Sequence, residues 1–209
     1  MKNKLYLVII FSLLGYLIYS YKNTSTYANE MQESISEKIL RFHVVANSDS
    51  ENDQALKLKV RDAVLAYITP KLVDCSSLSE TLTVIENESE NLQEVATNIV
   101  AQEGYNYSIN IAVTNCYFPM KTYADMVLPP GDYQALKIII GEGLGHNWWC
   151  VMFPNVCFVG NSTAIMPDES KEKLQYILTE EEYCSIFSEP DSQDDIHISF
   201  TSHFSKLFD

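Results

Sequence analysis

A chain of 209 residues, 46% of them hydrophobic, is long enough to bury a core and indicates a single domain once an N-terminal segment is set aside. Acidic residues number 28 against 14 basic ones, which gives a formal net charge of −14. Nucleic acid and anionic membranes would repel a surface of that sign, so the composition argues against both as electrostatic partners. A protein of an open aqueous compartment fits this balance.

The N-terminus has the features of an export signal. Lys2 and Lys4 precede the unbroken apolar run LYLVIIFSLLGYLIY at 5–19, and secretory signals place positive charge before such a run. The run is short for a membrane span, which needs about 20 residues. Small residues ending at Ala28 offer a weak cleavage site. We expect residues 1–28 to be a signal peptide or, if uncleaved, an N-terminal anchor that makes the protein's membrane contact.

Beyond the leader, the composition predicts three further segments. The polar residues 29–38 are expected to form a short stalk, residues 39–160 the folded domain, and residues 161–209 an acidic C-terminal extension. A helix is expected in the extension, starting near 179–182, because acidic and apolar residues are spaced for one there. Residues 196–208 fit either a strand or a helix.

The first part of the domain predicts a strand, a turn and a helix. Aromatic and β-branched residues dominate 39–46, which favours a strand, and the polar residues 47–53 end it. Apolar residues then recur every three or four positions over 54–68, on one face of a helix. Ser50 and Asp53 resemble a capping box, which specifies the start of the helix.

The basic residues of this helix are expected on its solvent-facing side. Lys57, Lys59 and Arg61 fall mostly between the apolar positions. They could form a local basic patch, although alternating solvated charge is the commoner explanation.

The remaining elements set the fold class. Apolar spacing predicts a second long helix over 78–100, and alternation predicts a strand at 105–118. The runs at 133–140 and 148–153, each preceded by a turn, are expected to be strands as well. The run at 133–140 would pair with an earlier strand in a hairpin or meander. The order is β-α-α-β-β-β with a C-terminal helical tail. It predicts an α+β fold, a single domain whose mixed or mainly antiparallel sheet is packed by the two long helices.

The acidic residues of the polar turn invite a metal interpretation. Asp49, Glu51 and Asp53 are spaced like the first ligands of a calcium loop. The pattern then fails, because Gln54 occupies the place of the required glycine and Val60 the place of the bidentate glutamate. Turn and helix-cap chemistry explains the acids instead. We predict no metal site and no cofactor.

A histidine near these acids suggests acid/base catalysis. His43 could work with Asp49 or Asp53 in a secreted hydrolase, but a histidine inside a strand is more often a packed structural residue. The glycines of GEGLGHN at 141–147 do not complete a nucleotide-binding motif and are expected to form a turn in which the backbone passes closely under bulky neighbours. We predict no catalytic residues and keep as an alternative a secreted hydrolase, metal-dependent or acid/base, that uses His43 with Asp49 or Asp53.

Two pairs of residues near 150 leave alternatives open. Cys150 and Cys157 flank a segment that Pro154 can turn, so a disulfide is possible, and buried thiols are an equal alternative. Trp148 and Trp149 are adjacent, so in a strand they face opposite sides, and one is exposed unless a second packed layer buries both. An exposed tryptophan could anchor a partner or make the protein a cell-wall-binding module.

Two long motifs carry a family resemblance. RFHVVANSDSENDQALKLKVRDAVL at 41–65 and PPGDYQALKIIIGEGLGHNWWCVMFPNVCFV at 129–159 follow the leader in this order. Together they resemble stage II sporulation protein R of endospore-forming Firmicutes, over a domain from about Leu40 to Gly160.

The resemblance implies a signalling protein rather than an enzyme. Members of the family are made in the forespore and exported to the intermembrane space. There they activate a membrane-embedded aspartic protease, whose extracytoplasmic region is the implied partner, and this protease processes pro-sigma E in the mother cell. No catalytic residue carries over. The positions that match the motifs are candidates for either a role in the fold or partner contact: Arg41, His43, Asn47, Ser48, Asp49, Asp53, Lys57, Arg61, Glu142, Asn147, Trp148 and Trp149.

Overall fold

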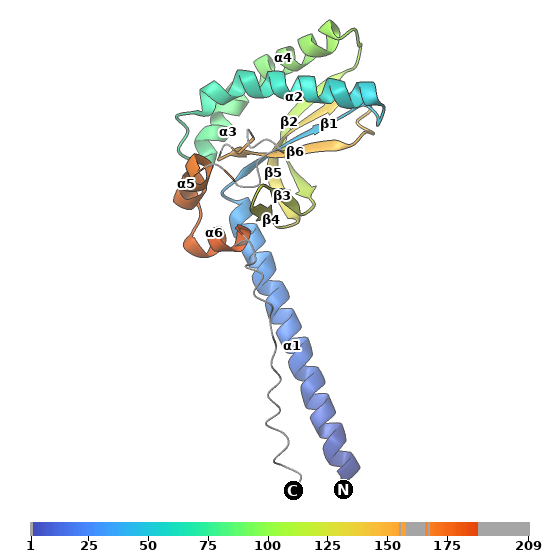
Figure 1. The fold of residues 1–209 in the computed structure, drawn as a ribbon, viewed down its shortest axis with the longest axis vertical. Coiled ribbons are helices and arrows are strands. Elements are labelled where there is room, and N and C mark those ends of the chain that lie inside the picture. The colour runs from blue at the N-terminus through green and yellow to red at the C-terminus, as the bar shows by residue number, and fades with distance from the viewer. Residues whose placement is uncertain (1, 155, 158–165, 167, 188–209) are drawn as a thin grey trace.

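The computed structural model describes the chain except residues 1, 155, 158–165, 167 and 188–209 (Figure 1). Its elements confirm the α+β class. The helices are α1 (Lys2–Ser36), α2 (Glu51–Leu72), α3 (Leu78–Asn87), α4 (Ser89–Gln102), α5 (Asp168–Ile177) and α6 (Glu180–Ile186). The strands are β1 (Leu40–Val45), β2 (Ile109–Phe118), β3 (Lys121–Tyr123), β4 (Met126–Leu128), β5 (Gly131–Ile140) and β6 (Asn147–Phe153).

Within the described residues, the main sheet has four strands in the order β2-β5-β1-β6 and is mixed, as expected. β2 runs antiparallel to β5, and β1 lies parallel to β5 and antiparallel to β6. β5 therefore pairs with the earlier β2, although the short β3–β4 hairpin separates them in sequence. β6 does not pair with β5, because β1 is inserted between them. This places the ends of β1 and β5 beside the start of β6.

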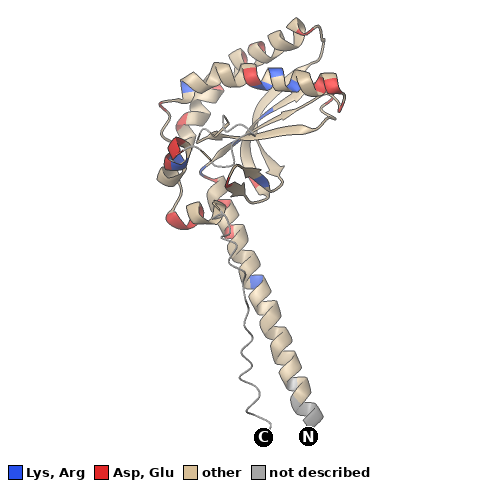
Figure 2. Cartoon of the chain, viewed as in Figure 1, with Lys and Arg blue, Asp and Glu red and all other residues tan. Residues whose placement is uncertain are grey.

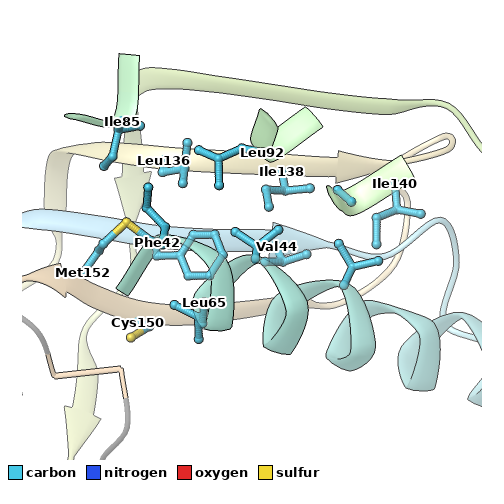
Figure 3. Packing of buried hydrophobic residues seen from close by; sticks show 14 of the residues in the cluster. Phe42, Val44, Leu65, Ile85, Leu92, Leu136, Ile138, Ile140, Cys150 and Met152 are labelled. Carbon is cyan, nitrogen blue, oxygen red and sulfur yellow. The ribbon is translucent and has the colours of Figure 1, made fainter. Parts of the chain in front are cut away.

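Helices α2, α3 and α4 cover the inner face of this sheet. Alternation along β1 points Leu40, Phe42 and Val44 into an apolar core beneath them. Figure 3 shows Phe42 and Val44 meeting Leu136, Ile138 and Leu92 in this layer. The α2 start agrees with the prediction, since the Ser50 hydroxyl accepts a hydrogen bond from the Asp53 amide at 3.2 Å.

The predicted second helix over 78–100 is two helices. α3 ends at Asn87, and Glu88 leaves the helical conformation before α4 begins. The Glu88 carboxylate is held by α2, where Tyr67 donates a hydrogen bond to it at 2.5 Å and the Lys71 ammonium lies 3.1 Å away. The break lets α3 and α4 each pack against α2, and the apolar spacing alone does not reveal it.

The outer face of the sheet is covered by the end of α1, the β3–β4 hairpin, α5 and α6. Met126, Leu128, Leu174 and Ile186 are buried in this second core. The helix expected near 179–182 is α6, which Thr179 and Glu182 start with a complete capping box. Parts of the expected extension thus belong to the folded unit, and the ambiguous segment 196–208 lies outside the described residues.

The end of α1 also joins this outer core. The segment 29–38, expected as a polar stalk, continues α1 to Ser36, and Ile35 is fully buried. Glu182 of α6 holds this end of α1 in place, because its carboxylate accepts hydrogen bonds from Ser34 at 2.5 Å and from Lys38 at 2.6 Å. Earlier in α1 the apolar side chains are exposed, and Figure 2 shows that this part of the helix is largely uncharged. Among the described residues, no helix combines the length and apolar character that crossing a bilayer requires.

A disulfide joins Cys150 to Cys157, so of the two alternatives the structure contains the bridge. Their Cα atoms lie 5.4 Å apart because the chain turns back after β6. The Val156 amide donates a hydrogen bond to the Val151 carbonyl at 3.1 Å and helps to hold the returning chain in place.

Candidate interaction surface

Two turns that are almost a hundred residues apart in sequence meet at one end of the sheet. Residues 47–53 follow β1 and lead into α2, and residues 141–147 join β5 to β6. They meet because β1 lies between β5 and β6, with Val45 opposite Asn147. We call residues 47–53 and 141–147 the double turn.

Glycines allow the two backbones of the double turn to touch. A Cβ atom at Gly145 would lie 2.2 Å from the Ser48 carbonyl oxygen. Gly141 has a φ of +58°, and a Cβ atom there would meet the Asn47 side chain. The expected close approach is confirmed, but a bulky neighbour occurs only at Gly143, which passes the Ile139 side chain, whereas Gly141 and Gly145 pass Asn47 and Ser48. The Gly145 amide donates to the Ala46 carbonyl at 3.0 Å across this contact.

A buried carboxylate organises the first half of the double turn. Asp53 accepts hydrogen bonds at Oδ2 from the Ser48 hydroxyl at 2.5 Å and from the Asn47 amide at 2.9 Å. These hydrogen bonds, that from Ser48 first, lower the pKa of Asp53 and keep it ionised. Asn47 also accepts from the Glu142 amide at 3.0 Å. Asp53 thus fixes the first half of the double turn and, through Asn47, the second.

Asp49 and His146 close the double turn from outside. Asp49 Oδ1 accepts hydrogen bonds from the His146 amide at 2.6 Å and lies 2.5 Å from His146 Nδ1. These contacts lower the pKa of Asp49, the imidazole contact being the largest cause. Both side chains are exposed, so the pair presents a carboxylate and an imidazole to solvent in a fixed orientation.

Lys57 supports the double turn from below. Its ammonium donates to the His146 carbonyl at 2.9 Å and to the Gln54 side chain at 2.5 Å. It is only 5% exposed, so the expectation of a solvent-facing Lys57 is wrong. The turn from β5 to β6 covers this position of α2, and the helix's own spacing cannot show that. The possibility of a local basic patch is not supported either, because Lys59 pairs with Glu103 and Arg61 with Asp62.

The outer surface of the double turn is rich in exposed side chains of different chemistry. Asp49, Glu142, His146 and Asn147 are exposed, and the Leu144 side chain is 79% exposed at the tip. The motif reasoning missed Leu144 and left His146 out of the contact candidates. A large apolar side chain within a glycine turn was the available signal for Leu144.

Arg41 lies buried on the outer face of β1. Its Nε donates to the Cys150 carbonyl at 3.3 Å and its Nη2 to the Tyr123 hydroxyl at 2.8 Å. The guanidinium carbon lies 4.2 Å from the centroid of the Phe118 ring and 4.9 Å from that of Tyr133. Nη1 has no hydrogen-bond partner among the described residues, and burial lowers the pKa of Arg41.

His43 lies on the same face beside Arg41. Its ring is 4.3 Å from the Trp149 ring and its Nδ1 is 3.9 Å from the Cys116 sulfur. Burial, together with the charge of Lys137, lowers the pKa of His43 to about 4, so the imidazole is neutral at physiological pH.

The burial of His43 is relevant to the alternative of a hydrolase in which His43 works with Asp49 or Asp53. His43 faces the outer side of the sheet among Trp149 and Phe118, whereas Asp53 belongs to α2 on the inner side. Asp49 is engaged by His146 instead. The structure therefore does not bring His43 together with either acid. Arg41, His43, Asp53 and Lys57, four of the candidates for partner contact, lie beneath the surface and position other groups.

The tryptophans face opposite sides of β6, as alternation predicts, and each is half-buried. Trp148 packs edge-on against Phe42 on the inner face, with the Arg61 guanidinium 4.7 Å from its ring centroid. Trp149 lies on the outer face, with the Lys121 ammonium 5.5 Å from its ring centroid. A shallow hollow lies between Trp149, Lys121 and the Asp49–His146 pair. Trp149 therefore extends the surface of the double turn.

No group of three or more His, Cys, Asp or Glu side chains suited to holding a metal ion occurs among the described residues. Two of the three acids that resembled calcium ligands accept hydrogen bonds within the double turn, Asp53 from Ser48 and Asn47, and Asp49 from His146. What the arrangement offers is a rigid, exposed polar surface with one apolar tip.

Comparison with known proteins places these turns within one family. The family described as Stage II sporulation protein R matches residues 36–163, which contain the whole double turn. Stage II sporulation protein R of Bacillus subtilis (strain 168) is 38% identical over 175 residues, covering 82% of this chain and 78% of that protein. That name denotes a sporulation protein and no enzymatic activity. No solved structure is significantly similar to the chain.

Proposed function

Because the chain belongs to the stage II sporulation protein R family, and is thus a sporulation protein, we propose that it is an exported signal of endospore formation. In this proposal it is made in the forespore, reaches the intermembrane space, and binds the extracytoplasmic region of a membrane-embedded aspartic protease. Binding activates the protease, which processes pro-sigma E in the mother cell. The protein acts as an activator and not as an enzyme.

The observation that carries the proposal is the construction of the double turn. Loops usually vary and move, whereas this one is held by Asp53 and Asn47 from within and by the Asp49–His146 pair from outside. A rigid surface loses little conformational freedom when a partner binds, which favours recognition. Leu144 and Trp149 add apolar area next to the polar groups, the usual composition of an interface centre.

The proposal is tested by substitutions that change the exposed surface and leave the buried supports intact. We expect Asp49→Ala and Leu144→Ser to reduce pro-sigma E processing in sporulating cells while the exported protein keeps its normal level. Lys59→Ala is the matched control, because it removes an exposed ion pair with Glu103 on α2 outside the double turn. Normal processing in both double-turn variants would refute the role of this surface.

A further inference from the structure

β2 forms an open edge of the main sheet. Its neighbour on one side is β5, and the other side carries no strand among the described residues. The Ser108 carbonyl points toward β5, where it accepts from the Gly141 amide, and the Ile109 carbonyl points outward, where it accepts from the Gln93 side chain. Backbone direction alternates along a strand, so the N–H and C=O groups of Ile111, Val113 and Asn115 also point outward.

This edge lacks the usual protections against strand addition. β2 pairs with β5 over ten residues without a register shift, so no bulge bends it away, and neither proline nor lysine occurs within it. Residues 112–115 are all exposed, and Val113 is 38% exposed. A long, regular and partly apolar edge of this kind is a template for an added strand.

A groove runs beside the edge on its inner face. It is bordered by α3, α4 and β2 and has a volume of about 440 Å³. Buried Ile85, Leu92 and Leu136 line it, with Ile111 and Val113 of β2 along one side. Side chains of a strand alternate between its two faces, so every second residue of a strand added to β2 would enter this groove.

The negative charge beside the groove favours a positively charged binding segment. Among the described residues that line it, Glu86 is the charged one. A second copy of this chain would bring another Glu86 and another net charge of −14 to the same edge. A segment with a lysine or arginine next to its apolar residues meets the opposite charge.

We propose that β2 binds an extended segment of a partner protein as a fifth strand of the sheet. This segment carries apolar side chains at alternate positions, which fill the groove, and a basic residue that pairs with Glu86. Outward backbone groups from Ile111 to Asn115 supply the affinity, and the groove and Glu86 supply the selectivity.

The test uses the full chain and short synthetic peptides of alternating threonine and valine, flanked either by lysines or by glutamates. We expect the lysine peptide to bind and to shift the NMR signals of β2 and the groove, and the glutamate peptide to bind about tenfold more weakly or less. N-methylation of alternate peptide amides, which blocks the ladder, should abolish binding whichever protein variant is used. A wild-type chain that fails to bind the lysine peptide, or binds both peptides equally, would overturn the proposal.

Variants of the chain locate the site. Val113→Pro removes an outward N–H that β5 does not use, so it should spare the fold and reduce the peptide affinity at least tenfold. Glu86→Lys should remove the preference for the lysine peptide, whereas Glu90→Lys, the same charge change at an exposed α4 residue outside the groove, should keep it. Unchanged affinity in a folded Val113→Pro chain, or a wild-type dimer that Val113→Pro dissociates, would contradict this occupant.

Discussion

Two polar clusters lie along β1 and its continuation, and they differ in their access to solvent. Arg41 and His43 are enclosed by aromatic rings on the outer face of the sheet. The double turn, which follows β1, is held by hydrogen bonds that are just as specific, but its outer side chains are exposed. The enclosed cluster can act only through stability, whereas the exposed one has side chains free to meet a partner. Substitutions should therefore separate the two, and the predictions below run from the largest expected effect on stability to the smallest.

Arg41→Ala should destabilise the protein most, by about 2–5 kcal/mol, because it leaves a cavity among aromatic rings and takes a partner from the Tyr123 hydroxyl. Arg41→Met keeps most of the side-chain volume and removes a buried cation that has no carboxylate partner among the described residues. It should therefore lower the free energy of unfolding by less than about 1.5 kcal/mol. Urea unfolding measures both. Equal destabilisation by the two substitutions would show that the charge, and not the packing, is what the enclosure requires.

Asp53→Ala should lower the free energy of unfolding by about 1–3 kcal/mol, because it leaves the Ser48 hydroxyl and the Asn47 amide without their acceptor inside the double turn. The stability that Asp53 contributes depends on pH, because folding lowers the pKa of Asp53. The stabilisation is fully present above the unfolded-state pKa of about 3.9 and is lost as the pH falls through the lower folded-state pKa. Thermal unfolding of wild type and Asp53→Ala should converge at the acidic end of that range, and a constant difference would contradict the assignment.

His43 should make the protein sensitive to a different pH range. Its pKa of about 4 in the folded state lies below the unfolded value of about 6.5, so the unfolded chain binds the extra proton. Stability should therefore fall as the pH is lowered from about 6.5 to 4. His43→Phe keeps an aromatic ring beside Trp149 and removes the titrating group. Its melting temperature should vary less than that of wild type over this range, and an identical slope would sink the prediction.

The smallest effect on stability is expected at the Asp49–His146 pair. Both side chains are exposed, and exposed polar pairs contribute little to the free energy of unfolding. The unfolding midpoints of Asp49→Ala and His146→Ala should stay close to that of wild type, while processing of pro-sigma E falls. If the same variants unfold early and lose their exported level, the double turn belongs with the enclosed cluster as a structural feature.

The sequence predicts the elements that are determined by residues close to one another in the chain. The strand at 39–46, the cap at Ser50 and the opposite facing of Trp148 and Trp149 all follow from neighbours within a few residues. The β3–β4 hairpin escaped prediction because strands of three residues are too short to show a period.

The errors arise where a distant segment decides the environment. Lys57 is buried because the turn at 141–147 covers it, and the break at Glu88 is fixed by contacts to α2. His43 was weighed with Asp49 and Asp53 because they are near in sequence, but the sheet lies between His43 and α2. Arg41 is a candidate for partner contact because it matches the family motif, and the motif does not show that three aromatic residues from β2, β3 and β5 enclose it.

The most direct measurement of the proposed role is reconstitution. The exported part of the chain would be added to liposomes that contain the membrane protease with its pro-sigma E substrate inside. We predict that the wild-type chain starts cleavage from the outside, that Asp49→Ala and Leu144→Ser at equal folded concentration do so poorly, and that Lys59→Ala acts as wild type. Cleavage that proceeds equally with wild type and with both double-turn variants, or that wild type fails to start, would contradict the role assigned to this surface.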